Sequence, residues 1–395
     1  MKIAERALKI DPFHVMEVAK AASLMESGLT AGDPSMIHLT IGEPDFTAPE
    51  RVQRAATEAI RKGVTQYTPA LGIMPLREKI SGWYSQRFGL NVPSERIVVT
   101  AGASAALLLT CLALIDEGDE ILMPDPSYPC NRHFVSAAGG RSVLLPTTPQ
   151  NRFQLTASQV AASWSEKTRG VLLASPSNPT GTSVHPDELK RIHAAVKARN
   201  GITILDELYL GLSFQQEFSV SGLKIDNSII SINSFSKYFS MTGWRLGWMV
   251  VPEVLVPVIE RLAQNFFLCP STVAQHAAIA CFEPDSIDEY EQRRAEFKAR
   301  RDWFIPALQE AGFHVPVLPD GAFYAWADCT DWCERWGVPT SWEFAFEAMK
   351  RAHVAISPGR DFGFDSTDRY VRFSTASSLG ELEQAITRFI DLKRS

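Results

Sequence analysis

One lysine, Lys237, stands in an apolar stretch that also carries serines, SINSFSKYFSMTGWRLGW at 231–248. Lysines normally lie at the surface with their charge in water, whereas this one stands between aromatic neighbours such as Phe235 and Tyr238. A lysine amine in such a place can do covalent chemistry, because it can form a Schiff base with an aldehyde. Arg245 follows eight residues later and adds a planar cation that suits a phosphate or a carboxylate. The stretch therefore indicates a covalent attachment point next to an anion site.

Further polar and aromatic residues follow the ends of short apolar runs. These runs are rich in β-branched residues and predict buried strands at 97–100, 120–123, 170–174, 202–206 and 228–232. In a parallel sheet, ligands bind at the carboxyl ends of the strands. The residues that this rule brings to one crevice are Ala103 and Ser104, Tyr128, Asn178, Asp206 and Tyr209, and Ser234, Ser236 and Lys237.

Each of these features has a plain structural explanation when it is taken alone. The turn AGASAA at 101–106 can simply pack a helix against a strand, SNPTG at 177–181 can be an ordinary loop, and Asp206 can cap a helix. Together they comprise an aromatic face, an acid, an amide, a phosphate-binding turn at a helix start, and a lysine. This set predicts a site for pyridoxal phosphate (PLP), attached to Lys237.

The elements that must position these residues alternate between strands and helices. Helical patterns at 103–116, 158–165 and 187–199 separate the apolar runs, which also include 142–145 and 248–251. This order predicts an α/β domain with a mostly parallel central sheet, covered by helices on both faces.

The pattern changes after about residue 252. A long helical pattern covers 285–311, and short strands in GAFYAWAD (321–328) and YVRFSTA (370–376) precede a closing helix from Leu379. Together with a helical pattern at 11–30, these segments predict a smaller α+β domain. The predicted boundaries are 47–284 for the large PLP-binding domain, and 1–46 with 285–395 for the small domain that includes the N-terminal segment.

The bulk composition excludes some classes of partner. The 395 residues carry a net charge of −6, so nothing suggests a surface for nucleic acid or an anionic membrane. The uncharged stretch 97–115 resembles a membrane span, but Gly102, Ser104 and Thr110 within it favour a strand, a glycine turn and a buried helix. We therefore expect no nucleic-acid partner and no membrane segment.

The cysteines and the start of the chain indicate a cytoplasmic protein. Six cysteines are thinly spread over the chain, which fits reduced thiols rather than a disulfide framework. Cys329 and Cys333 lack companions at zinc-site spacing, so we expect no metal. The opening MKIAERALKIDPFHV has no apolar run and does not look like a signal peptide.

The motifs SPSNPTG (175–181), DELY (206–209) and SFSKYFSMTGWRLGW (234–248) resemble those of the class I and II aminotransferases of PLP fold type I. The resemblance extends over nearly the whole chain, because five further motifs match: TIGEPDF (40–46), YTPALGIMPLREKI (67–80), GAFY (321–324), SPGRDFG (357–363) and VRFS (371–374). It implies an aspartate-aminotransferase-like fold with a large and a small domain, a PLP cofactor, and a homodimer with shared active sites.

Carried over position by position, the resemblance implies a role for each of these residues. Lys237 becomes the Schiff-base lysine and proton shuttle, and Asp206 the partner of the pyridine nitrogen. Tyr209 and Asn178 would donate hydrogen bonds to the phenolic oxygen, and Tyr128 would stack on the ring.

The resemblance also implies the residues that hold the two anionic groups. The substrate α-carboxylate would be bound by Arg372, with help from Asn178 and the backbone at Gly42. The phosphate would be bound by Ala103, Ser104, Ser234, Ser236 and Arg245, together with Tyr67 of the other subunit.

Transamination from an L-amino acid to a 2-oxo acid such as 2-oxoglutarate or pyruvate, by a ping-pong mechanism, is the reaction that the resemblance implies. The same scaffold also hosts C–S β-lyases, which share the lysine and the aspartate. A non-enzymatic PLP-binding regulator is a more remote alternative and would need an attached DNA-binding module. A Rossmann-type nucleotide site at GASAA is not expected, because the sequence lacks the third glycine and the acid about twenty residues later.

The choice of substrate depends on a cation that is missing from the sequence. Aspartate-specific relatives bind the distal carboxylate with an arginine before a proline turn of the partner subunit, or with a lysine in the phosphate-binding turn. Here the first stretch reads AQNFFLCPS (263–271) and the second position is Ser104. A carboxylate in an apolar pocket without a cation is strongly disfavoured. We therefore expect a monocarboxylic donor, either alanine or a larger apolar or aromatic amino acid.

Two alternatives stay open for this pocket. Phe266, Phe267 and Leu268 suggest an apolar side-chain pocket, yet glutamate or 2-oxoglutarate could still serve as second substrate if Arg132 swings in. An aspartate aminotransferase is the other alternative.

Overall fold

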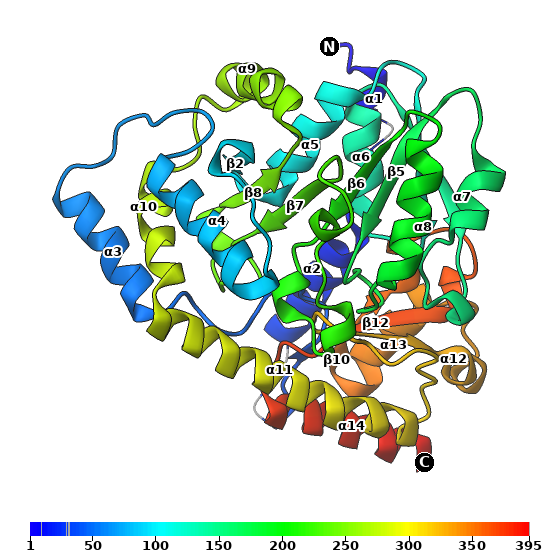
Figure 1. Ribbon diagram of the computed structural model, residues 1–395. Helices are drawn as coiled ribbons and strands as arrows, with labels where there is room; N and C mark the ends of the chain where they lie inside the picture. Colours follow the sequence, from blue (N-terminus) through cyan, green and yellow to red (C-terminus); the bar gives the residue numbers. More distant parts are fainter. Residues whose placement is uncertain (9, 29, 31, 395) are drawn as a thin grey trace.

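A seven-stranded sheet forms the centre of the computed structural model, which describes residues 1–8, 10–28, 30 and 32–394 (Figure 1). The strand order is β2-β8-β7-β6-β5-β3-β4. Strands β7, β6, β5, β3 and β4 pair in parallel, and β8 runs antiparallel to both β2 and β7. The predicted mostly parallel sheet is thereby confirmed. The bounds are β2 (Ile97–Thr100), β3 (Glu120–Asp125), β4 (Arg141–Pro146), β5 (Thr168–Ala174), β6 (Ile202–Asp206), β7 (Ile230–Ser234) and β8 (Gly247–Val250).

Helices cover both faces of this sheet, which explains why its strands are apolar throughout. Leu172 and Ile204 face one layer of helices, whereas Val171 and Leu205 face the other. The first layer contains α5 (Gly102–Leu114), α6 (Pro129–Ala137) and α9 (Val256–Phe266), and the second contains α4 (Met74–Phe88), α7 (Ala157–Ser163) and α8 (Pro186–Lys197). Helix α10 (Thr272–Ile279) packs against α4 and also against α3 (Glu50–Arg61).

The uncharged stretch 97–115 is divided between a strand and a helix, as the sequence predicts. Strand β2 ends at Thr100, and α5 begins at Gly102, whose φ of +81° makes the turn between them. Among the residues that the structure describes, no helix is both long and apolar enough to cross a membrane.

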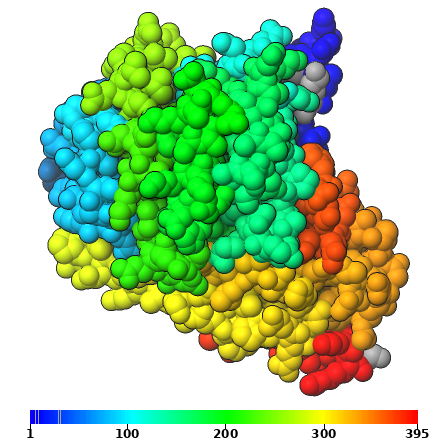
Figure 2. All heavy atoms as spheres, turned by 45° about the vertical axis from the view of Figure 1, so that its right-hand side comes forward, coloured from blue at the N-terminus to red at the C-terminus, as the bar shows by residue number. Residues whose placement is uncertain are grey.

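A second group of elements combines the two ends of the chain. Strands β11 (Ser357–Pro358), β12 (Tyr370–Ser374) and β9 (Tyr324–Asp328) form an antiparallel sheet, and β1 (Ile37–His38) pairs in parallel with β10 (Val354–Ala355). The helices of this group are α2 (His14–Ser27), α11 (Pro284–Glu310), α12 (Thr330–Trp336), α13 (Ser341–Ala352) and α14 (Leu379–Arg394). The short helix α1 (Glu5–Leu8) lies apart from them, near the N-terminus at the other end of the molecule (Figure 1). Figure 2 shows the C-terminal third, yellow to red, below the green and teal part of the chain.

The long helix α11 contacts two of the hydrophobic clusters. Tyr290 and Phe297 pack with the core around α4 and β8, whereas Phe304 and Leu308 pack with the core that includes β1, β10 and β12. The predicted domain boundaries, with the whole helix in the small domain, stay a prediction. The predicted helix at 11–30 is shorter in the structure, because α2 begins after the extended Phe13 and ends before Gly28.

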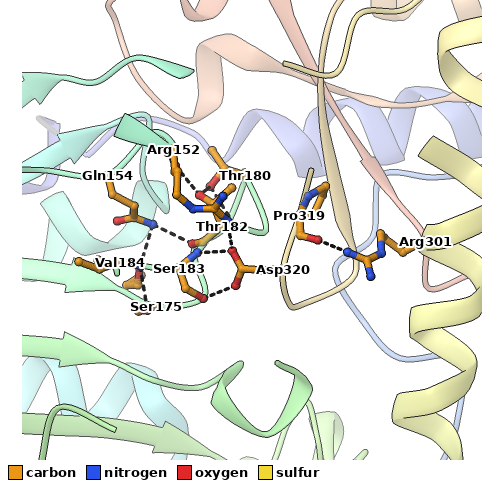
Figure 3. A network of polar contacts seen from close by, with 11 residues as sticks. Arg152, Gln154, Ser175, Thr180, Thr182, Ser183, Val184, Arg301, Pro319 and Asp320 are labelled. Carbon is orange, nitrogen blue, oxygen red and sulfur yellow. Dashed lines mark hydrogen bonds and ion pairs between the residues drawn. The ribbon is translucent and has the colours of Figure 1, made fainter. Parts of the chain in front are cut away.

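A buried polar network joins three loops near the carboxyl ends of the central strands (Figure 3). The Asp320 carboxylate accepts hydrogen bonds from the backbone N–H (2.8 Å) and the hydroxyl of Ser183, and it pairs with the Arg152 guanidinium. Arg301 of α11 donates to the carbonyl oxygen of Pro319. Because the Asp320 side chain is fully buried, its charge depends on these donors.

We expect Asp320→Asn to lower the free energy of unfolding by about 1–3 kcal/mol, because the amide leaves a cation and a buried hydroxyl without their anionic acceptor. The measurement is urea denaturation followed by tryptophan fluorescence. Asp391→Asn, at an exposed position on α14, is the control and should change the free energy of unfolding by less than about 0.5 kcal/mol. Equal effects of the two substitutions would contradict the importance of the network.

Candidate active site

The carboxyl ends of the central strands open onto a cavity of about 430 Å³. The N-terminal segment and strands β9 and β12 contribute its opposite wall, through residues such as Phe13, Tyr324 and Arg372. Of the site residues predicted from the sequence, the cavity is lined by Gly42, Ala103, Ser104, Tyr128, Asn178, Asp206, Tyr209, Ser234, Ser236, Lys237, Arg245 and Arg372.

Lys237 points into this cavity, while its aromatic neighbours point away from it. Phe235 and Phe239 are buried in the core, where the Phe235 ring lies 4.9 Å from Trp248. The Lys237 ammonium donates a hydrogen bond to the carbonyl oxygen of Gly42. Burial lowers the pKa of Lys237 to about 8, so about a tenth of the amine is neutral at pH 7. A neutral amine can act as a nucleophile and accept a proton.

Two adjacent acids at the end of β6 point to opposite sides. Asp206 lines the cavity, where its Oδ1 accepts a hydrogen bond from the Leu208 N–H at 3.2 Å. Glu207 accepts bonds from the Ser221 hydroxyl (2.9 Å) and the Gly222 N–H (2.7 Å), away from the cavity. Burial raises the pKa of Asp206 to about 7. Asp206 therefore suits a cationic partner, which would stabilise its charged form.

Asn178 and Arg372 meet across the cavity. Arg372 is 2% exposed, and its Nη1 donates to Asn178 Oδ1 at 2.8 Å. Its Nη2 donates to the Ser357 hydroxyl at 3.2 Å and to the carbonyl oxygen of Thr40. Because a guanidinium can only donate, the oxygen of the Asn178 amide must face Arg372. The amide nitrogen is then left as a donor on the other side.

The residues predicted to bind phosphate surround the start of α5. Ala101, which precedes the helix, makes no side-chain cap, so the first N–H groups remain available for an anion. An added Cβ at Gly102 would lie 2.7 Å from Arg245 Nη2, and one at Gly247 would lie 2.8 Å from the backbone nitrogen of Ala103. Glycine at these two positions therefore lets the arginine and strand β8 approach the helix closely. The Ser234 hydroxyl lies alongside and accepts from the Ser236 N–H at 3.0 Å.

Some predicted residues lie outside the cavity of this chain. Tyr67 is 81% exposed, and its contribution to a partner subunit stays a prediction. Phe266 and Leu268 are also exposed, and neither they nor Phe267 line the cavity of this chain. Arg132 donates to the carbonyl oxygen of Asp361 and lies over the Phe364 ring.

Sequence reasoning assigned no role to several residues that do line the cavity. Tyr324 and Glu43 belong to motifs that match the family, GAFY and TIGEPDF, which could have drawn attention to them. Phe13, Val15 and Met16 come from the first turn of α2 and the residue before it, where only the helical spacing was visible.

Taken together, the residues fit pyridoxal phosphate. The cavity is lined by Arg245, three serines and the start of α5, which suit a phosphate, and by an amide, a buried acid and a lysine whose pKa is lowered by burial. Within the described part of the chain, no cluster of three or more His, Cys, Asp or Glu side chains could hold a metal ion.

Comparisons with known proteins agree with this chemistry. The model of the family "Aminotransferase class I and II" matches residues 34–389. The valine–pyruvate aminotransferase of Mycobacterium tuberculosis is 38% identical over 388 residues, which cover 98% of this chain and 97% of that protein. The aspartate aminotransferase of Geobacillus stearothermophilus is 32% identical over 392 residues, or 98% of each chain. A crystal structure of an aminotransferase from M. tuberculosis has a TM-score of 0.93 at 37% identity and covers 99% of both chains. This chain belongs to the class I and II aminotransferases, which are PLP-dependent enzymes.

Proposed function

We propose that this aminotransferase moves the amino group of a monocarboxylic L-amino acid with an apolar side chain to a 2-oxo acid, by a ping-pong mechanism. The observation that carries the proposal is the apolar lining of the cavity. Its apolar side chains include Phe13, Val15, Met16, Ile41 and Leu107, from the N-terminal segment and α5.

The charges of the cavity support a donor with a single carboxylate. Among the described residues that line it, the cations are Lys237, Arg245 and Arg372. We assign these to the cofactor, its phosphate and the substrate α-carboxylate, so no cation is left for a second carboxylate. Glu43 adds a negative charge to the same cavity. A distal carboxylate placed there would lose its water without gaining a partner.

The named relatives support two substrate classes. The name of the M. tuberculosis relative contains valine and pyruvate, which each carry one carboxylate, and such substrates suit a cavity without a further cation. The G. stearothermophilus relative is named an aspartate aminotransferase, which keeps aspartate as the second candidate. A C–S β-lyase reaction is the third outcome to be tested.

When bound, PLP supplies an electron-withdrawing ring and a carbon that carries the amino group between two substrates. Asp206 would keep the ring nitrogen protonated, because a buried carboxylate and a cation stabilise each other's charge. The Asn178 amide nitrogen and the Tyr209 hydroxyl would donate to the phenolic oxygen, and Tyr128 would lie against the ring. Lys237 would hold the cofactor covalently and move a proton to and from the substrate Cα.

We further propose a homodimer in which Tyr67 reaches the partner's phosphate site. The segment that carries this exposed tyrosine is held to α10, because Thr272 donates to the Gln66 carbonyl oxygen and Gln275 donates to Thr68. The side chain is thus presented by a fixed backbone rather than by a free loop. Sedimentation of the active enzyme as a monomer would contradict this proposal. The cytoplasmic location likewise stays a prediction.

The substrate proposal predicts that kcat/KM for the best of valine, alanine, leucine and phenylalanine exceeds that for aspartate by at least about tenfold. Each donor is assayed with pyruvate and with 2-oxoglutarate by the 2-oxo acid formed. Ser104→Lys, which adds a cation beside the cavity, should raise the relative use of aspartate. A wild-type preference for aspartate would overturn the proposal, and pyruvate and ammonia released without an acceptor would indicate a lyase.

The assigned roles predict different failures for Lys237→Ala and Arg372→Lys. Borohydride should attach the cofactor of the wild type to the peptide that contains Lys237, and Lys237→Ala should lose both this adduct and essentially all turnover. Arg372→Lys should keep the adduct but raise KM for the amino donor about tenfold or more, because lysine lacks the planar two-bond contact with a carboxylate. An adduct on another lysine, or an unchanged KM, would show that the corresponding residue is misassigned.

A further inference from the structure

Tyr324, the first residue of β9, lies between residues from both sides of the cavity. Its hydroxyl oxygen is 2.6 Å from the hydroxyl oxygen of Tyr209. The Arg372 guanidinium lies over its ring, 4.5 Å from the centroid. The side chain is 1% exposed, and an added Cβ at Gly42 would lie 2.1 Å from its hydroxyl oxygen. Glycine at position 42 therefore makes room for this hydroxyl.

Only one of the two tyrosine hydroxyls can donate in the bond that joins them. A cation over an aromatic ring is attracted to its electrons and favours negative charge on the phenolic oxygen, which makes Tyr324 the stronger donor. The Lys237 ammonium is farther from the Tyr209 ring, at 5.8 Å. If Tyr324 donates, the hydrogen of Tyr209 is free to point into the cavity.

The ionisable groups that face this pair leave both hydroxyls protonated. Burial raises the pKa of Tyr209 and of Tyr324 above their ordinary values, so neither titrates near neutral pH. Smaller effects come from Tyr128, which raises the pKa of Tyr209, and from the Arg372 guanidinium, which lowers the pKa of both tyrosines. The bond between them is therefore a neutral donor–acceptor pair whose direction the surroundings decide.

We propose that Tyr324 is a positioning residue that connects the α-carboxylate site with the phenolic-oxygen site. Its hydroxyl donates to Tyr209, so that Tyr209 donates to the cofactor, and its ring supports the plane of the Arg372 guanidinium. This inference rests on the roles proposed above for Tyr209 and Arg372.

The test uses the holoenzyme and records the absorption of bound PLP as a function of pH. In Tyr324→Phe, the Tyr209 oxygen loses its donor, so the donation of Tyr209 to the phenolic oxygen becomes weaker. A hydrogen bond to the ionised phenolic oxygen of the cofactor stabilises that ionised form. The colour change of the cofactor should therefore move to higher pH by about 0.5–1 unit, the size expected for one hydrogen bond.

The ring of Tyr324 has a separate readout. Tyr324→Phe keeps the ring under Arg372 and should change KM for the amino donor by less than about threefold, whereas Tyr324→Leu should raise it about tenfold. Tyr370→Phe is the control, since it removes a hydroxyl from the strand of Arg372 at a position outside the cavity. It should change neither the colour transition nor KM.

A double variant separates this inference from the roles on which it rests. Tyr209→Phe alone should shift the colour transition, and Tyr209→Phe with Tyr324→Phe should shift it no further, because Tyr324 acts through Tyr209. No shift in Tyr209→Phe would overturn the role of Tyr209 together with the inference. If Tyr209→Phe does shift the colour transition, three results would overturn the inference alone. These are no shift in Tyr324→Phe, a shift to lower pH in Tyr324→Phe, or a shift in the double variant that equals the sum of the two single shifts.

Discussion

The loss of water around one acid and one lysine is the constraint on which the rest of this structure depends. Burial raises the pKa of Asp206 to about 7 and lowers that of Lys237 to about 8, because water no longer stabilises the charged form of either group. Neither shift would exist at an open strand end. Helices on both faces of the sheet and the N-terminal segment across the cavity keep water out, and the fold thereby creates the chemistry of the site.

The contacts across the cavity follow a single scheme, in which a residue after a central strand bonds to a residue from one end of the chain. Lys237 donates to Gly42, Asn178 accepts from Arg372, and Tyr209 meets Tyr324. Outside the cavity, the network around Asp320 joins the same parts of the chain (Figure 3). The site is therefore assembled from both groups of elements, and neither group holds it alone.

The sequence allowed much of this to be predicted, because strand ends and charged side chains leave local signals. Continuous apolar runs predicted the parallel sheet, and the comparisons confirm the fold class, the family and the cofactor. Tyr324, Glu43 and Phe13 received no role, because their position depends on how the ends of the chain pack against the central sheet. The apolar pocket expected from Phe266, Phe267 and Leu268, in the stretch assigned to the partner subunit, stays a prediction. In this chain the apolar side chains of the cavity come from the N-terminal segment and α5, for example Phe13, Ile41 and Leu107.

The pairing of β1 with β10 has a consequence for the synthesis of the protein. Ile37 pairs with Val354, a partner more than three hundred residues later in the chain. At the usual speed of translation this strand waits roughly 15–60 s for its partner to leave the ribosome. Meanwhile the apolar side chains of α2 and β1 have no core to enter, which exposes them to chaperones and to aggregation. The part of the cavity lining that comes from the N-terminal segment is therefore made first, yet it completes its packing only after the C-terminal strands have been made.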